Sequence, residues 1–235
     1  MSSDHVAAYA RVLERIASAC SRSGRSVEEI TVVGVTKGHP QGVLSKARAL
    51  NLGDLGENKV QEAIVKYGNG ELVSIANARR LHLIGHLQSN KVKKAVELFD
   101  CLDTVDSEDL AETVARAAGQ AGRRVRVLLQ VNTSHEAQKS GIDPLRASWL
   151  AERVLRLENI DFFGLMTIGP LTDGEREIRQ SFADLRDLRD RLERDFGGAR
   201  LPVLSMGMSG DFDWAIEEGA TEIRLGTILW GARTA

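Results

Sequence analysis

Residues 31–40 read TVVGVTKGHP. The run before the lysine is rich in β-branched side chains, which is typical of a buried strand, and Gly38 and Pro40 end it. A buried parallel strand is apolar nearly throughout, so Lys37 at its carboxyl end is unusual. In α/β folds, ligands bind at that end of the strands. Lys37 could therefore form a Schiff base, bind a phosphate or act as a base; a surface lysine in a βα loop is the alternative.

The alternation of strand and helix continues along the chain. Strand-like runs occur at residues 31–36, 51–56, 81–85, 98–105, 125–132, 160–168, 203–208 and 222–225. Helical patterns lie at residues 5–21, 42–49, 58–67, 91–98, 107–120, 144–157, 175–196 and 212–218. Eight strands alternating with helices predict an α/β fold, a closed (β/α)8 TIM barrel with an extra N-terminal helix and one domain over residues 1–235. An open doubly wound sheet is the alternative.

The composition argues against several classes of protein. The chain is 43% hydrophobic and 27% charged, as in an ordinary globular domain. A formal net charge of −2 and a pI near 6.2 give no sign of a nucleic-acid or membrane surface. No signal peptide or membrane-length apolar run is visible, and Cys20 and Cys101 are expected to be free thiols. We expect a cytoplasmic protein.

Two glycine-rich loops near the C-terminus predict a phosphate site. The seventh strand ends in SMGMSGD, residues 205–211, and the eighth in RLGT, residues 224–227. Glycines allow close backbone approach, hydroxyl groups donate hydrogen bonds, and a helix N-terminus near Asp211 offers free N–H groups. Barrels of this type often hold a phosphate between these loops. With Lys37 across the mouth, the pattern favours a phosphate-bearing ligand; tight turns in a rim of small residues are the alternative.

Two other polar residues near strand ends, Asn58 and Glu57, each have two interpretations. Asn58 either caps the next helix or contacts a ligand. Glu57 either pairs with a cation at the barrel mouth or favours the helix dipole. His86 lacks a partner at the spacing of a catalytic triad, and no His, Asp and Glu cluster has the spacing of metal ligands. We therefore expect neither a triad nor a metal.

Eight short blocks carry a resemblance to a known family. They are VTK at 35–37, GENKVQE at 56–62, HLIGHLQSNK at 82–91, QVN at 130–132, KSG at 139–141, GLM at 164–166, LSMGMS at 204–209 and RLGT at 224–227. Together they resemble the pyridoxal phosphate homeostasis proteins, in the order of that family and over nearly the whole chain. The resemblance implies a barrel similar to the N-terminal domain of alanine racemase, with pyridoxal 5'-phosphate (PLP) as cofactor.

The resemblance also implies roles for individual residues. Lys37 matches the family's Schiff-base lysine, and Arg224 matches the arginine that faces the pyridine nitrogen. The complete set that it assigns to the cofactor is Lys37, Asn58, Ser205, Arg224, Gly226 and Thr227. The chain departs from the commoner family pattern at Gly38-His39, where Thr-Lys is usual, and at Leu81, where an aromatic residue is common. These departures affect the rim of the site and leave the lysine in place.

The site predicted in this way favours cofactor binding over catalysis. PLP acts as an electron sink that a protonated pyridine nitrogen assists, and a cationic Arg224 would keep that nitrogen unprotonated. The related racemases also use a tyrosine base from an added β-domain, whereas this sequence ends at Ala235, soon after the eighth strand. Its only tyrosines, Tyr9 and Tyr67, fall in predicted helices.

Three functions are therefore considered. The first is a monomeric, non-catalytic carrier that holds PLP on Lys37, buffers it and delivers it to PLP-requiring apo-enzymes, without nucleic-acid or membrane partners. The second is a small PLP-dependent amino-acid racemase or lyase. The third is a barrel lyase or isomerase that uses no PLP and acts on a phosphorylated metabolite, with Lys37 as the base.

Overall fold

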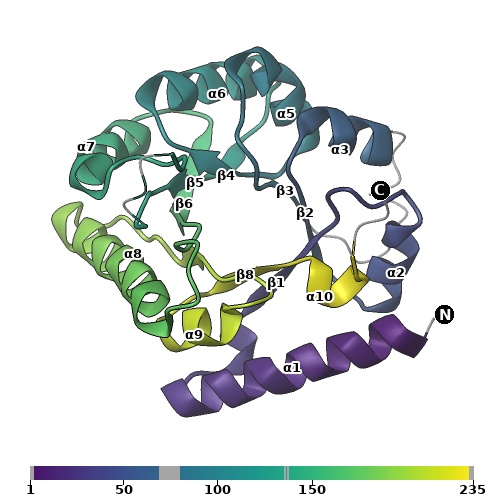
Figure 1. The fold of residues 1–235 in the computed structure, drawn as a ribbon. Helices are drawn as coiled ribbons and strands as arrows, with labels where there is room; N and C mark the ends of the chain where they lie inside the picture. Colours follow the sequence, from purple (N-terminus) through teal and green to yellow (C-terminus); the bar gives the residue numbers. More distant parts are fainter. Residues whose placement is uncertain (1–2, 69–79, 135, 137, 233–235) are drawn as a thin grey trace.

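The computed structural model describes residues 3–68, 80–134, 136 and 138–232. Eight strands form a closed barrel, in which each strand pairs in parallel with its neighbours and the spatial order follows the chain (Figure 1). The strands are β1 Thr31–Val35, β2 Asp54–Glu57, β3 Arg80–Leu83, β4 Cys101–Val105, β5 Val125–Gln130, β6 Ile160–Met166, β7 Val203–Ser205 and β8 Glu222–Leu225. The predicted barrel is confirmed, and the open sheet is not the fold.

Helices surround the strands, and the predicted helical segments are confirmed with small changes at their ends (Figure 1). They are α1 Ser3–Ser23, α2 Val43–Ala49, α3 Val60–Tyr67, α5 Val92–Leu98, α6 Glu108–Gln120, α7 Pro144–Leu155, α8 Glu175–Asp195 and α9 Phe212–Glu217. Three short helices were not expected: the 3-10 turns Val27–Glu29 and Ser89–Lys91, and α10 Thr227–Trp230.

Several strands are shorter than their apolar runs, because local backbone conformation limits them. Asn51 was expected to begin the second strand, but its φ of +55° belongs to the turn after α2, and the strand starts only at Asp54. At the other end of the barrel, Gly207 has a φ of +91°, which bends the chain after β7 ends at Ser205. Both positions have left-handed backbone, which interrupts the regular extended conformation of a strand.

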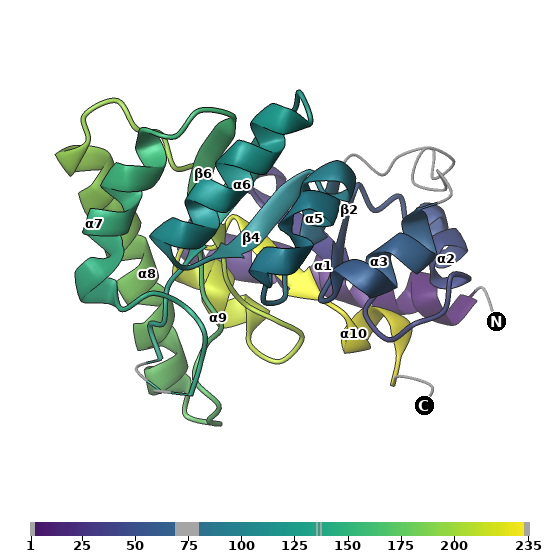
Figure 2. The ribbon, with the colours of Figure 1, turned by 90° about the horizontal axis from the view of Figure 1, so that it is seen from above.

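The barrel closes between the first and last strands. Thr31 to Gly34 pair in register with Glu222 to Leu225. The Trp230 indole N–H, from α10, donates to the Val35 carbonyl oxygen at 2.9 Å and fixes the end of β1 against the segment after β8. Outside this seam, α1 packs against α9 and α10. Because α10 follows β8, it lies at the rim of the barrel where the strands have their carboxyl ends (Figure 2).

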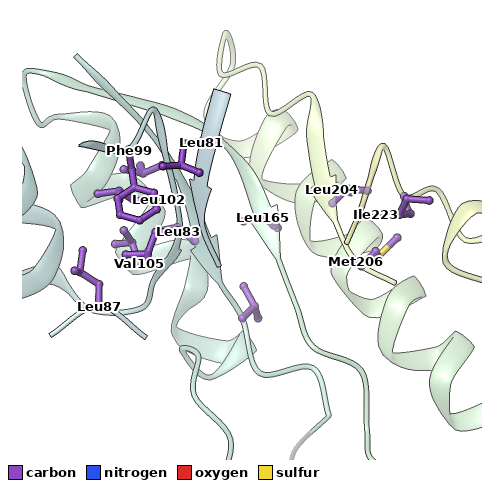
Figure 3. Packing of buried hydrophobic residues seen from close by; sticks show 14 of the residues in the cluster. Leu81, Leu83, Leu87, Phe99, Leu102, Val105, Leu165, Leu204, Met206 and Ile223 are labelled. Carbon is purple, nitrogen blue, oxygen red and sulfur yellow. The ribbon is translucent and has the colours of Figure 1, made fainter. Parts of the chain in front are cut away.

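The apolar core lies between the strands and the helices. Leu81, Leu83 and Leu102 gather with Phe99 on one side, while Leu204 and Ile223 gather on another (Figure 3). Strand residues alternate between two faces, so the neighbours of these side chains point into the barrel. Those interior neighbours are unusually polar; they include Asp54, His82, Asp103, Glu222 and Arg224, all buried. The interior therefore carries charge, while the outer layer supplies the hydrophobic packing.

The long helices are amphipathic. In α8, one apolar stripe is buried and the charged residues remain outside, where Arg179 and Arg186 pair with acids at the end of α9, Glu217 and Glu218. The alternating acids and bases of α8 therefore form a solvated helix face, as expected. In the described ranges, no helix combines the length and apolar character that crossing a membrane requires.

A substitution at Phe182 tests the packing between α8 and the barrel. Its ring is fully buried in the apolar core. Phe182→Ala should lower the free energy of unfolding by about 3–5 kcal/mol, because it removes buried apolar surface and leaves a cavity. Urea unfolding measures the change. Leu171→Ala, at a side chain that is 92% exposed, is the control and should change stability by no more than about 0.5 kcal/mol. An equal loss in both variants would contradict this core assignment.

Candidate functional site

A cavity of about 290 Å³ lies at the carboxyl ends of the strands. We call it the strand-end cavity. Its lining residues are Val35, Lys37, Asn58, Ile84, Ile168, Met208, Ser209, Gly210, Arg224, Gly226 and Thr227. These residues come from the ends of six different strands, which is the position expected for a functional site in this fold. Five of the six predicted cofactor residues are among them; the sixth, Ser205, lies deeper in the barrel.

Lys37 follows the end of β1, and its half-buried side chain forms part of the cavity wall. Gly38 comes next with a φ of +70°, a left-handed conformation that glycine adopts without strain. The chain therefore turns away from the barrel immediately after the lysine. This position favours a ligand-contacting lysine over a surface lysine in a loop.

Arg224 projects from β8 into the upper part of the barrel, where it is 4% exposed. Its Nη1 donates to Ser205 Oγ and its Nη2 to the Thr167 carbonyl oxygen, both at 2.7 Å. Both acceptors are neutral. Burial lowers the pKa of Arg224, and the more distant carboxylates of Glu222, Asp103 and Asp211 oppose that effect. The result is a buried cation at the cavity wall without a carboxylate in direct contact among the hydrogen bonds described.

The loop after β7 is built for close packing. A Cβ on Gly207 would lie 2.5 Å from the Ala215 Cβ, so only glycine allows the loop to pack this tightly on α9. The Asp211 carboxylate accepts from the Met208 N–H at 2.5 Å and closes the loop. Burial raises the pKa of Asp211, against this hydrogen bond and the charge of Arg224. Ser209 and Gly210, at the tip, face the cavity.

Ser205 is fully buried and accepts the hydrogen bond from Arg224. The strand alternation places it inside the barrel, between Leu204 and Met206 of the apolar layer. Its contact with Arg224 gives it a supporting position rather than a place on the cavity wall. Ser209 supplies the hydroxyl that the same loop presents to the cavity.

Asn58 does not cap α3. The residue at the N-cap is Lys59, and no side chain makes a capping hydrogen bond there. Asn58 instead lines the cavity, which leaves ligand contact as the remaining interpretation. Its backbone packs so closely on the next strand end that a Cβ on Gly85 would lie 2.2 Å from the Asn58 carbonyl oxygen. Gly85 is thus required for the position of Asn58.

Glu57 is fully buried rather than placed at the rim. Its Oε1 accepts from Lys66 Nζ at 2.5 Å and from Thr36 Oγ1 at 2.6 Å. Burial raises the pKa of Glu57, although Lys66 and Thr36 act in the opposite direction. Of the two interpretations of Glu57, pairing with a cation is the one observed, and its partner belongs to α3.

A second polar cluster fills the barrel interior below Arg224. His82 Nδ1 lies 3.0 Å from Asp103 Oδ2, and His82 Nε2 lies 3.2 Å from Asp54 Oδ1. Burial by itself would lower the pKa of His82, but the charges of Asp103 and Glu222 and its hydrogen bonds hold it well above the usual value. His82 is therefore a buried imidazolium that donates to two carboxylates.

The sequence spacing gave no sign of this cluster, because His82 lies on β3 and its neighbours Cys101 and Asp103 lie on β4. Ligand atoms of His82, Cys101 and Asp103 lie within 4.8 Å of one another. A metal would need a neutral imidazole with a free nitrogen. Both His82 nitrogens face carboxylates, so the arrangement suits a protonated histidine better than a metal ligand.

Some lining residues were missed by sequence reasoning. Ile84 and Ile168 stand at the ends of predicted strands, so their position was a usable signal. Ser209 and Gly210 belong to the loop that the sequence predicts to bind phosphate, although the set of cofactor residues takes only Ser205 from it. Tyr67 is not on the cavity wall and gave no signal in the sequence, because only the fold brings its hydroxyl group within 2.6 Å of Oγ1 of Thr36, the residue before Lys37.

Comparisons with known proteins identify the family and the fold of the chain. Residues 9–234 match the family described as alanine racemase, N-terminal domain. The chain is 40% identical to the pyridoxal phosphate homeostasis protein of Aquifex aeolicus over 223 residues, 95% of this chain and 96% of that one. It is similar to the solved structure of PipY from Synechococcus elongatus with PLP bound, at a TM-score of 0.81 and 39% identity, covering 94% of this chain and 100% of that one. An alanine racemase of Clostridium difficile shares the fold, with a TM-score of 0.74 at 16% identity over 95% of this chain and 57% of that one.

The interior cluster makes stability depend on pH. Since the pKa of His82 is raised in the folded state, its contribution is complete below the unfolded value of about 6.5 and is lost as the pH rises through the folded value. The difference in unfolding free energy between the wild type and His82→Gln should therefore shrink as the pH rises above about 6.5. Chemical denaturation at a series of pH values measures it. A difference independent of pH would mean that His82 is neutral in the fold.

Proposed function

The chain belongs to the family of the alanine racemase N-terminal domain, and we propose that it binds PLP in the strand-end cavity and serves the homeostasis of this cofactor. One observation carries the proposal. The cavity wall combines a lysine amine, Lys37, with a buried guanidinium, Arg224, and its other residues are apolar, amide, hydroxyl or glycine. A wall of this kind suits a small anionic aromatic aldehyde.

Lys37 supplies the covalent contact in this proposal. Its neutral amine adds to an aldehyde carbon and, with loss of one water molecule, forms a C=N Schiff base; addition of water reverses the step without any oxidant or reductant. When bound, PLP supplies that aldehyde and an aromatic ring that can accept electrons. The turn at Gly38 and the half-buried wall orient the amine towards the cavity.

The phosphate group is assigned to the glycine and hydroxyl face of the same cavity. Ser209, Gly210, Gly226 and Thr227 present hydroxyl groups and backbone there, and Asn58, after β2, adds an amide. Hydroxyl and backbone donors bind phosphate oxygens well. Ser205 acts indirectly, because its hydroxyl holds Arg224 in place.

Arg224 is assigned to the pyridine nitrogen, and this assignment limits the chemistry. A guanidinium is a donor with no acceptor atom, so a nitrogen opposite it must accept and stay unprotonated. Such a ring withdraws electrons weakly. The function we favour is a carrier with little or no turnover, which protects PLP as a Schiff base and releases it to PLP-requiring apo-enzymes.

The second candidate function is an amino-acid racemase or lyase. The shared fold with alanine racemase favours it. Against it, the residues described on the cavity wall include no tyrosine, histidine, cysteine or carboxylate that could act as a second base. We further propose one PLP-binding domain over residues 1–235 and a monomeric, cytoplasmic protein; a sizing column with light scattering tests the monomer.

Lys37 is the residue that tests the proposal. Purified wild type mixed with PLP should show the visible absorption band of a Schiff base, and borohydride reduction should add one PLP to the peptide that contains Lys37. Lys37→Ala should lose both signals, while Lys93→Ala, at an exposed lysine outside the cavity, should keep them. No band in the wild type, or equal labelling of many lysines, would overturn the assignment.

Amino acids distinguish the carrier from the enzyme. The loaded protein should not exchange the α-hydrogen of L-alanine or D-alanine in deuterated water, because a ring whose nitrogen stays unprotonated opposite Arg224 withdraws electrons too weakly to assist loss of that proton. Proton NMR over many hours measures the exchange, with a known PLP racemase as the positive control. Sustained exchange that depends on Lys37 would favour the racemase instead.

A further inference from the structure

The backbone on both sides of Lys37 is held by polar side chains from α3. Glu62 and Lys66 are four residues apart and lie on the same side of this helix, Tyr67 follows Lys66, and Glu57 joins them from the end of β2. Figure 1 shows α3 on the outside of the barrel, next to β2 and β3. None of these side chains is on the wall of the strand-end cavity as described above. They act on the segment that carries its lysine.

The peptide that leads into Lys37 has several partners. Its carbonyl oxygen, on Thr36, accepts from Lys66 Nζ at 2.7 Å and from the His39 N–H at 3.1 Å. The Thr36 N–H donates to the Gly56 carbonyl oxygen at 2.9 Å. On the other side of the lysine, the Gly38 N–H donates to the Glu62 carboxylate at 2.5 Å. The residues before and after Lys37 are thus fixed.

The side chains also close a ring of hydrogen bonds. Thr36 Oγ1 donates to Glu57 Oε1, which leaves the Thr36 oxygen to accept from the Tyr67 hydroxyl group at 2.6 Å. Lys66 Nζ completes the ring, since it donates both to Glu57 Oε1 and to the Thr36 carbonyl oxygen. Tyr67 and Lys66 are consecutive in α3, so one turn of helix reaches both the side chain and the backbone of Thr36.

The buried ion pair of Lys66 and Glu57 adds little to the stability of the fold. The Lys66 and Glu57 side chains are 5% and 0% exposed, and Glu57 Oε2 has no hydrogen-bond partner. Removing two charges from water costs about as much as their attraction returns, so apolar residues could replace the pair with little loss of stability. What apolar residues could not replace is the hydrogen bond to the Thr36 carbonyl oxygen.

We propose that Glu57, Lys66 and Tyr67 form a clamp that holds Thr36, the residue before Lys37, and thereby sets the rate at which Lys37 takes up and releases its aldehyde ligand. The inference rests on the proposed function, because it assigns regulation to the same lysine. All three are positioning residues; none of them contacts the ligand. The clamp keeps the amine of Lys37 in one place, which lowers the entropy lost when the C=N bond forms.

Two variants remove the clamp in different ways. Glu57→Leu/Lys66→Met replaces the ion pair by apolar side chains of similar size and leaves no buried charge unpaired. Tyr67→Phe removes one hydroxyl group and keeps the ring in the core. Val65→Ala, at an α3 position that is 81% exposed, is the matched control for changes in the helix. If the double variant does not fold, Tyr67→Phe carries the test alone.

The first measurement uses the unloaded protein. Amide hydrogen exchange followed by mass spectrometry should accelerate in the peptide that contains Gly38 and His39, by about tenfold or more in both clamp variants, while peptides of the barrel core stay protected. Lys66→Arg, which keeps the cation, should restore protection. Unchanged exchange in this peptide would overturn the clamp whatever PLP does.

The second measurement follows exchange of the ligand. Stopped-flow absorbance after mixing with PLP should show Schiff-base formation slowed by about ten- to a hundredfold in the clamp variants, with Val65→Ala like the wild type. Release is measured by trapping PLP with excess semicarbazide. Wild-type rates in variants with faster amide exchange would overturn the inference and leave the proposed function standing. No Schiff base in the wild type would instead refute the proposed function.

Discussion

Pairing between β1 and β8 is the constraint on which the site depends. Lys37 follows the first strand and Arg224 belongs to the last, so nothing local connects them. The register that sets Val33 opposite Arg224 brings both to one rim, and the hydrogen bond from Trp230 to Val35 fixes the two strand ends against each other. Once the barrel is closed, Gly226 and Thr227 lie beside the segment that carries the lysine, and all three residues line the same cavity. The strand-end cavity is therefore a consequence of closure.

Closure also creates an electrostatic problem, because the barrel interior holds charges. Asp54, Asp103 and Glu222 are countered by His82 and Arg224, with Arg80 pairing to Asp54 at the lower end. Glu222 Oε1 and Asp103 Oδ1 have no hydrogen-bond partners, so the interior is not optimised for stability alone. An apolar interior would be the cheaper solution for folding. The cluster is better explained by what it keeps in place: a guanidinium at the cavity wall whose direct acceptors, Ser205 and Thr167, are neutral.

Sequence reasoning could find the fold because strand and helix periods are local signals. It could also place Lys37, Arg224 and Thr227 at one rim, since strand ends converge in any parallel barrel. It could not foresee that Ser205 lies below the cavity and bonds to Arg224, because the depth of a residue inside the barrel depends on how the strands pair. Nor could it connect Tyr67 to Thr36 or His82 to Asp103, because those pairs depend on distances between elements. The family resemblance assigned residues to the cofactor, and the structure shows which of those residues line the cavity.

The two buried ionic clusters point to the same conclusion about chemistry. The cluster of Glu57 and Lys66 fixes the backbone before Lys37, and the cluster around His82 lies beneath Arg224. Neither offers a proton-transfer group to the cavity, since Glu57, Lys66 and His82 are not among the residues that line it. An enzyme that moves protons on its substrate needs a base at the cavity wall, with a pKa near the working pH. Charge in this protein is used to hold an amine and a guanidinium still, which suits a site that stores a reactive aldehyde better than one that converts it.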